Sequence, residues 1–173
     1  MRNRAATVAV WASACAWAIA ASGGVAQGQR GEDWSVYLPP GQARAIVARE
    51  CSVCHDLDGV VKLRKPAKDW EAIVLDMGAR GAAITIDDVD PVVAYLADVF
   101  GPMAPPFTDV DTATRDELTK LPGVTPAAAD TLLAQRKSKG RLSSHDEVRA
   151  ALGLDAARFD RIKPYLYLKP ESK

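Results

Sequence analysis

The chain has 173 residues, of which 48% are apolar and 25% are charged, which is typical of one or two small globular domains. This composition excludes a disordered tail and a collagen-like chain. Its 22 basic residues equal its 22 acidic residues, so overall charge does not by itself indicate a nucleic-acid-binding protein.

The first 26 residues have the pattern of a secretory signal peptide. Two arginines precede a continuous apolar stretch that ends in the small-residue sequence Gly24-Val25-Ala26. We expect cleavage near Ala26 and a periplasmic or secreted protein with no stable membrane span. An uncleaved membrane anchor is the alternative, because the apolar run is long enough for a bilayer-spanning helix of about 20 residues. Cleavage would remove Cys15 and leave two cysteines.

Three prolines within residues 102–107 indicate a domain boundary, because proline prevents helix formation and favours an extended connector. We expect a first domain at residues 27–101, a linker at 102–107 and a second domain at 108–173. Residues 27–105 carry eight basic and twelve acidic residues, whereas residues 106–173 carry twelve and ten. Apolar residues recur at helical spacing in both parts, without the alternation of strands, which predicts an all-α protein.

Helical spacing places three helices in the first domain. One helix follows Pro40-Gly41 and runs into residue 51, and another presents the stripe Trp70, Ile73, Val74 and Met77. The last helix is expected to begin near Asp90-Pro91, with aspartate as the cap and proline in the first turn. The apolar residues on its buried face are Val92, Tyr95, Leu96 and Val99.

The pentapeptide Cys51-Ser52-Val53-Cys54-His55 has the C-x-x-C-H spacing at which c-type haem is attached. Two thiols at this spacing can bond to the same porphyrin edge, and the following imidazole can then bind the iron. We therefore expect one covalent haem c, attached through Cys51 and Cys54, with His55 as an iron ligand.

Three other uses of the pentapeptide are a zinc site, a thioredoxin-like dithiol and a plain disulfide. A structural zinc needs about four ligands, and the exported part contains one further His or Cys, His145. A thioredoxin-like site requires a βαβ framework that this segment lacks. A plain disulfide gives His55 no role.

Met77 and Met103 are the candidates for a second axial iron ligand. We favour Met77, because its stripe faces the core, whereas Met103 lies in the linker. A packing role for Met77 and an open sixth position are the alternatives. An open position would suit a haem peroxidase. The chain shows no nucleophile–base pair and no phosphate-binding glycine loop, so we do not expect an enzyme.

Residues 40–102 resemble the short c-type cytochrome modules associated with periplasmic quinoprotein dehydrogenases. The shared features are CxxCH, the segment W-x-x-x-V-x-x-M and the end Y-L-x-x-x-F-G-P. The resemblance implies a small class I-like cytochrome c domain that shuttles electrons through one haem. It also implies the ligand roles of His55 and Met77 and a periplasmic redox partner, such as a quinoprotein dehydrogenase.

The second domain contains two helix-hairpin-helix units in tandem. Capping sequences S/T-x-x-E predict helix starts after Thr114 and Ser144. In each hairpin a glycine, Gly123 or Gly153, precedes by two positions a residue that can cap the next helix.

Residues 108–168 resemble the tandem helix-hairpin-helix domain of bacterial competence DNA receptors and of the small extrinsic subunit of photosystem II. In the DNA-binding members, hairpin amides at a helix start hold a phosphate. Here LPGIG becomes LPGVT, so Thr125 stands where a glycine would allow close approach. At the second hairpin, the carboxylate of Asp155 would repel a phosphate.

A basic cluster between the two units is the other candidate contact surface, although it also fits a solvated helix end. The candidate contacts to DNA or a protein partner are Gly123, Thr125, Arg136, Lys137, Lys139 and Arg141. We expect the domain to dock a protein partner and so position the cytochrome. DNA binding or DNA uptake is the alternative. His145 is expected at the surface.

Overall fold

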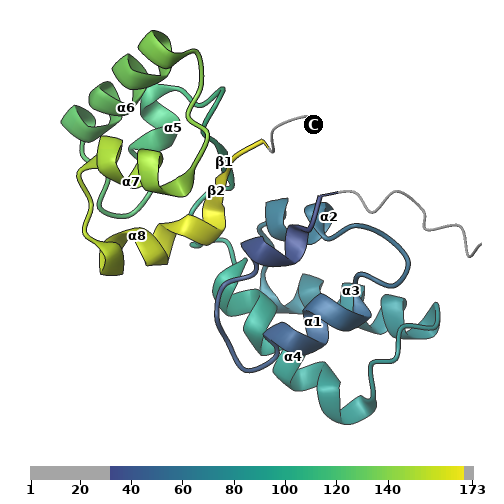
Figure 1. Ribbon diagram of the computed structural model, residues 1–173. Coiled ribbons are helices and arrows are strands. Elements are labelled where there is room, and N and C mark those ends of the chain that lie inside the picture. Colours follow the sequence, from purple (N-terminus) through teal and green to yellow (C-terminus); the bar gives the residue numbers. More distant parts are fainter. Residues whose placement is uncertain (1–31, 170–173) are drawn as a thin grey trace, which may run out of the picture. The chain divides into compact units, whose positions relative to one another are not determined.

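The computed structural model describes residues 32–169, so the predicted signal peptide and its cleavage site lie outside the described residues. The described residues are mostly helical (Figure 1), in agreement with the predicted fold class. In this range, no helix has the length and apolar character needed to cross a membrane. The described residues belong to one compact unit.

The first half of the described chain consists of short helices that pack on a longer one. The elements are η1 (Trp34–Tyr37), α1 (Arg44–Glu50), α2 (Asp58–Lys62), α3 (Ala67–Ala79) and α4 (Ile86–Val99). Both α1 and α3 pack against α4. The predicted face of α4, which includes Tyr95 and Leu96, is buried. This face therefore forms the core of the first half.

Helix α4 begins five residues earlier than the sequence predicted. Thr85 is its N-cap, and the carboxylate of Asp88 accepts a hydrogen bond from the backbone N of Thr85 at 3.0 Å. Pro91 consequently lies inside the helix instead of in its first turn. The capping box satisfies free amides at the earlier start, and this outweighs the amide that proline cannot supply.

The second half contains the two predicted helix-hairpin-helix units. Its helices are α5 (Arg115–Leu118), α6 (Pro126–Lys139), α7 (His145–Leu152), α8 (Ala156–Ile162) and η2 (Lys163–Tyr165). The caps at Thr114, Thr125 and Asp155 are confirmed, since each side chain accepts from the amide three residues later. Ser144 also caps α7, but the carboxylate of Glu147 reaches the amide of Ser143 instead of that of Ser144.

Two short strands in the second half were not predicted. Strand β1 (Thr108–Asp109) pairs in parallel with β2 (Leu166–Tyr167), with Thr108 opposite Leu166. A two-residue strand is too short to show the alternation by which strands are recognised in a sequence. The pairing joins the beginning of the second half to its end.

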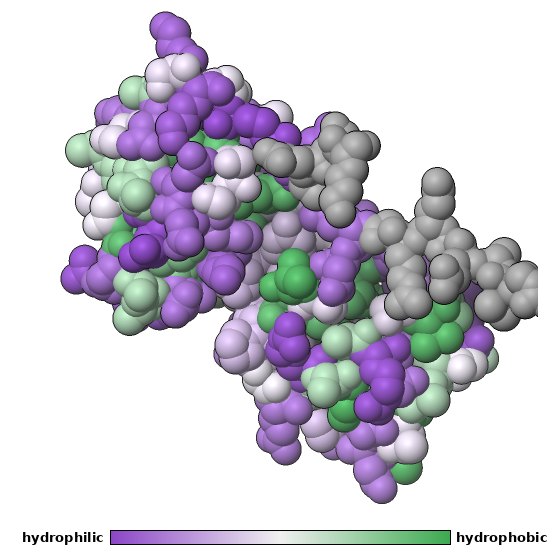
Figure 2. Space-filling model, viewed as in Figure 1, coloured by the Kyte–Doolittle hydropathy of each residue, from purple (hydrophilic) through white to green (hydrophobic). Residues whose placement is uncertain are grey.

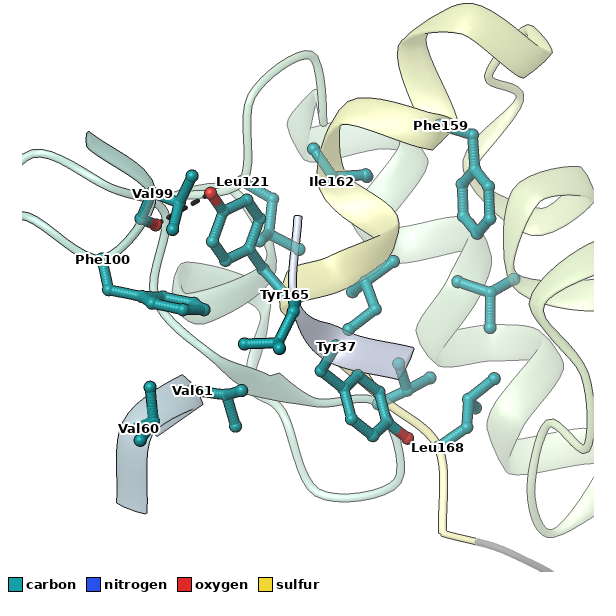
Figure 3. Close-up of a cluster of buried hydrophobic side chains, with 14 of the residues drawn as sticks. Tyr37, Val60, Val61, Val99, Phe100, Leu121, Phe159, Ile162, Tyr165 and Leu168 are labelled. Atoms are coloured by element: carbon teal, nitrogen blue, oxygen red, sulfur yellow. Dashed lines mark hydrogen bonds between the residues drawn. The ribbon is translucent and has the colours of Figure 1, made fainter. Parts of the chain in front are cut away.

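The end of α4 is a meeting point for distant segments. The indole Nε1 of Trp70 and the backbone N of Lys65 both donate to the carbonyl of Phe100, at 3.3 Å and 3.0 Å. Figure 3 shows the hydroxyl of Tyr165 directed at Val99, whose carbonyl accepts its hydrogen bond at 3.0 Å. The rings of Phe100 and Tyr165 are edge-on, with centroids 6.4 Å apart.

Arg64 binds the proline-rich segment to the first half. Its Nε donates to the carbonyl of Pro105 at 2.8 Å, and Nη1 donates to the carbonyl of Val61 at 2.9 Å. The guanidinium lies 5.5 Å from the ring centre of Phe100 and 5.6 Å from that of Tyr165. Burial lowers the pKa of Arg64. Backbone carbonyls and aromatic faces compensate for this partial loss of hydration.

Two glycines provide a matched test of packing ahead of α1. A Cβ at Gly41 would lie 2.5 Å from Cδ2 of the buried Tyr95, whereas a Cβ at Gly59, within α2, would meet nothing within 4 Å. We expect Gly41→Ala to lower the free energy of unfolding by about 1–3 kcal/mol through overpacking. Gly59→Ala should leave it unchanged or raise it by about 0.5–1 kcal/mol. Urea unfolding of both variants tests this, and equal effects would contradict it.

Candidate functional site

The five residues Cys51 to His55 form a turn directly after α1. Cys51 is half-buried, Cys54 is exposed, and both are free thiols. The exposed imidazole of His55 has its Nδ1 2.8 Å from the carbonyl of Asp56. A carbonyl only accepts, so Nδ1 carries the proton and Nε2 keeps a lone pair for a ligand. The ring is therefore held as a metal-binding imidazole commonly is.

The thiol of Cys51 is in a deactivating environment. Burial, and secondarily the adjacent carboxylate of Glu50, raise the pKa of Cys51. A thiol–disulfide catalyst needs a lowered thiol pKa, because the thiolate is the nucleophile. The surroundings of Cys51 therefore do not favour the thioredoxin-like alternative.

A metal site made of protein side chains alone is also not favoured. Between residues 32 and 169, no three His, Cys, Asp or Glu side chains are grouped so that they could hold a metal ion. A haem brings four nitrogen ligands of its own, so an iron held in this way needs only one or two side chains.

The two methionine candidates differ in exposure. Met77 lies near the end of α3 and is half-buried, whereas Met103 is 95% exposed. The stripe that contains Met77 faces the core as predicted, since Trp70 and Val74 are only 1% and 3% exposed. The role of Met77 as an iron ligand stays a prediction.

The two hairpins of the second half lie next to each other. Gly123, between α5 and α6, has φ +80°, and Gly153, between α7 and α8, has φ +63°. A Cβ at Gly123 would lie 3.9 Å from Cδ2 of Leu154, which belongs to the second hairpin. The positive φ at both glycines permits the tight reversal that brings each pair of helices together.

Two arginines of α8 reach the first hairpin. Arg158 and Arg161, together with Pro122 and Gly123, line a hollow of about 360 Å³. Both arginines are exposed. Figure 2 shows mainly hydrophilic residues on the visible face of the α5–α8 part. A hollow beside a glycine hairpin and lined by two guanidinium groups is suited to an anion.

The sequence reasoning missed Arg158 and Arg161. Their spacing on α8 puts them on the same helix face, but this signal does not show which other element the face approaches. The approach to the first hairpin depends on how the two units pack.

The predicted basic cluster lies far from the hairpins. The cluster occupies the end of α6, and Thr125 caps its beginning, so about 20 Å of helix separates them. Arg136 donates to the carbonyls of Val110 and Ala113 at 2.8 Å and 2.9 Å. The structure therefore does not bring these candidates together with Gly123 and Thr125.

Ion pairs and hydrogen bonds within the chain occupy two further members of this cluster. Lys139 Nζ lies 2.7 Å from Oε1 of Glu147. Arg141 donates to the carbonyl of Lys169 and lies 3.9 Å from a carboxylate oxygen of Asp111. Lys137 is exposed. The positive charge at this end is thus partly neutralised within the domain.

His145 is half-buried rather than at the surface. Its Nε2 lies 3.5 Å from the carbonyl of Leu166, and its ring is edge-on to Phe159 with centroids 6.2 Å apart. Burial lowers the pKa of His145. The residue therefore serves packing between α7, α8 and β2.

Comparison with protein families agrees with the geometry of the second half. Residues 108–167 match the family described as helix-hairpin-helix motif. No curated protein and no solved structure matches this chain. The second half therefore contains a helix-hairpin-helix motif.

Glu147 gives the second half a testable dependence on acid. The hydrogen bond from Lys139, followed by those from Ser143, lowers the pKa of Glu147 from the usual 4.5 to about 2. A lowered carboxyl pKa stabilises the fold above pH 4.5, and this contribution is lost as pH falls toward about 2. We expect Glu147→Gln to remove it, so the variant loses less stability over that range than the original protein.

Thermal unfolding across this pH range measures the effect. The control is Asp160→Asn, which makes the same charge change at a carboxylate that forms no ion pair among residues 32–169. Identical pH profiles for the two variants would refute the assignment.

Proposed function

We propose that the second half of the chain binds the phosphate backbone of DNA, as part of an exported DNA-binding or DNA-uptake protein. The observation that supports this most is the hollow beside Gly123, lined by Arg158 and Arg161, within a segment that matches the helix-hairpin-helix motif. This motif is typical of DNA-binding and DNA-uptake proteins.

The chemistry of these residues favours phosphate over base edges. Gly123 presents backbone without a side chain, and the two arginines can donate bidentate, charge-assisted hydrogen bonds to phosphate oxygens. Such contacts are independent of base sequence. Because few charges take part, binding is modest in affinity and weakens as salt displaces the protein from the phosphates.

The double variant Arg158→Gln/Arg161→Gln tests the hairpin surface. We expect about tenfold weaker binding to a 20-base-pair duplex and a salt dependence smaller by about two phosphate contacts, each worth about 0.9 in the logarithmic slope. Fluorescence anisotropy over a salt series measures both quantities. Lys137→Gln/Lys139→Gln removes the same charge at the far end of α6 and should change the affinity less than about twofold. Equal losses in the two double variants would exclude a specific site at the hairpin.

We also propose a second function, covalent attachment of one haem c for single-electron transfer by the first half. The observations that favour it are the C-x-x-C-H spacing, the two free thiols and the imidazole of His55 with Nε2 left for a ligand. Bound haem would supply reversible one-electron chemistry at iron.

The residues of the first half suit this group. Cys51 and Cys54 would hold it by thioether bonds, His55 Nε2 would bind the iron, and the half-buried Met77 is the better placed second ligand. Helices α1, α3 and α4 each present aliphatic side chains that are only partly buried, which a flat apolar ring could cover. These side chains are Ile46, Ile73, Val89 and Val93. In an electron carrier, the helix-hairpin-helix half would dock a periplasmic redox partner.

Expression together with haem-maturation proteins tests the attachment. We expect a protein whose mass in denaturant exceeds that of the polypeptide by one haem, and Cys51→Ala/Cys54→Ala should lose this mass. Ser52→Ala, between the two cysteines, should keep it. Met77→Leu should alter the visible spectrum and Met103→Leu should not. A protein that acquires no haem would contradict the second function without affecting the first.

A further inference from the structure

The two hairpins of the second half are alike in backbone and opposite in charge. In each, a glycine with positive φ precedes by two positions the N-cap of the following helix. The cap of α6 is the hydroxyl of Thr125, which is neutral, whereas the cap of α8 is the carboxylate of Asp155. A phosphate that approached both hairpins would therefore meet a negative charge at only one of them.

The position of the Asp155 carboxylate is fixed. One oxygen accepts from the backbone N of Arg158 at 2.8 Å, and the other lies 3.3 Å from the Nε of the same residue. The side chain thus remains at the hairpin instead of turning away from it. Its charge is offset on the side of Arg158 and not on the side of the hairpin backbone.

The arginines favour the first hairpin. Arg158 and Arg161 line the hollow beside Pro122 and Gly123, so both guanidinium groups serve the hairpin with the neutral cap. A water molecule takes up about 30 Å³ in the liquid, so a hollow of about 360 Å³ has room for a phosphate group and part of its sugar. Attraction and repulsion therefore divide one surface into a receptive and a repelling hairpin.

We propose that Asp155 limits phosphate contact to the first hairpin, so that this domain binds nucleic acid through one strand and does not prefer duplex over single-stranded DNA. This inference rests on the proposed binding of phosphate backbone. Two adjacent hairpins of equal charge would contact both strands of a duplex. A carboxylate at one of them removes the second contact, and with it the advantage of the duplex.

The test compares a 20-nucleotide single strand with the duplex of the same sequence, for the protein and two variants. We expect the unaltered protein to bind both probes with affinities within about threefold of each other at one salt concentration. Asp155→Asn keeps an efficient helix cap and removes the charge. It should tighten duplex binding at least about fivefold and steepen the duplex salt dependence by about 0.9, with less than about twofold change for the single strand.

Asp160→Asn is the matched control, because it makes the same charge change on an exposed residue of the same helix. It should alter binding of both probes less than about twofold. Thermal unfolding of each variant checks that the fold is kept, and Asp155→Glu, which retains the charge, should bind as the unaltered protein does.

The outcomes separate two kinds of failure. A tenfold preference of the unaltered protein for duplex, or equal effects of Asp155→Asn and Asp160→Asn, would overturn this inference and leave backbone binding in place. Failure to bind either probe at low salt would overturn the proposed function and the inference with it.

Discussion

The carbonyls of Val99 and Phe100 at the end of α4 are the positions on which the arrangement of the described chain depends. A buried carbonyl without a partner is costly, and these two receive donors from Trp70, Lys65 and Tyr165. Those donors come from before α4 and from close to the end of the chain. The same short segment therefore holds together parts of the sequence that are 66 positions apart.

Charge placement, more than total charge, sets what the helix-hairpin-helix half can bind. Most of the basic cluster at the end of α6 is used inside the domain, by carbonyls for Arg136 and by a carboxylate for Lys139. The arginines of α8 instead line the hollow by the first hairpin. A small excess of positive charge can thus serve an anion site if it is concentrated at one place.

The segment Cys51–His55 shows how local chemistry narrows the uses of a short motif. Its thiols are free, and the environment of Cys51 opposes the thiolate that a dithiol catalyst requires. The hydrogen bond from Nδ1 of His55 leaves Nε2 as the ligand atom. The segment and the hairpins use separate residues, so attachment of a haem and contact with DNA are chemically compatible in one chain.

The sequence by itself determined the helical class, the buried face of α4, the two hairpins and the caps at Thr114, Thr125 and Asp155, because these follow from periodicity and capping within a few residues. It misplaced the start of α4, where an aspartate–proline pair suggested a later cap than Thr85. Only the tertiary structure decided that Arg158 and Arg161 meet the first hairpin, that Arg136 and Arg141 are used internally, and that β1 pairs with β2. These contacts join residues distant in sequence, and their partners are chosen by packing, which no local pattern encodes.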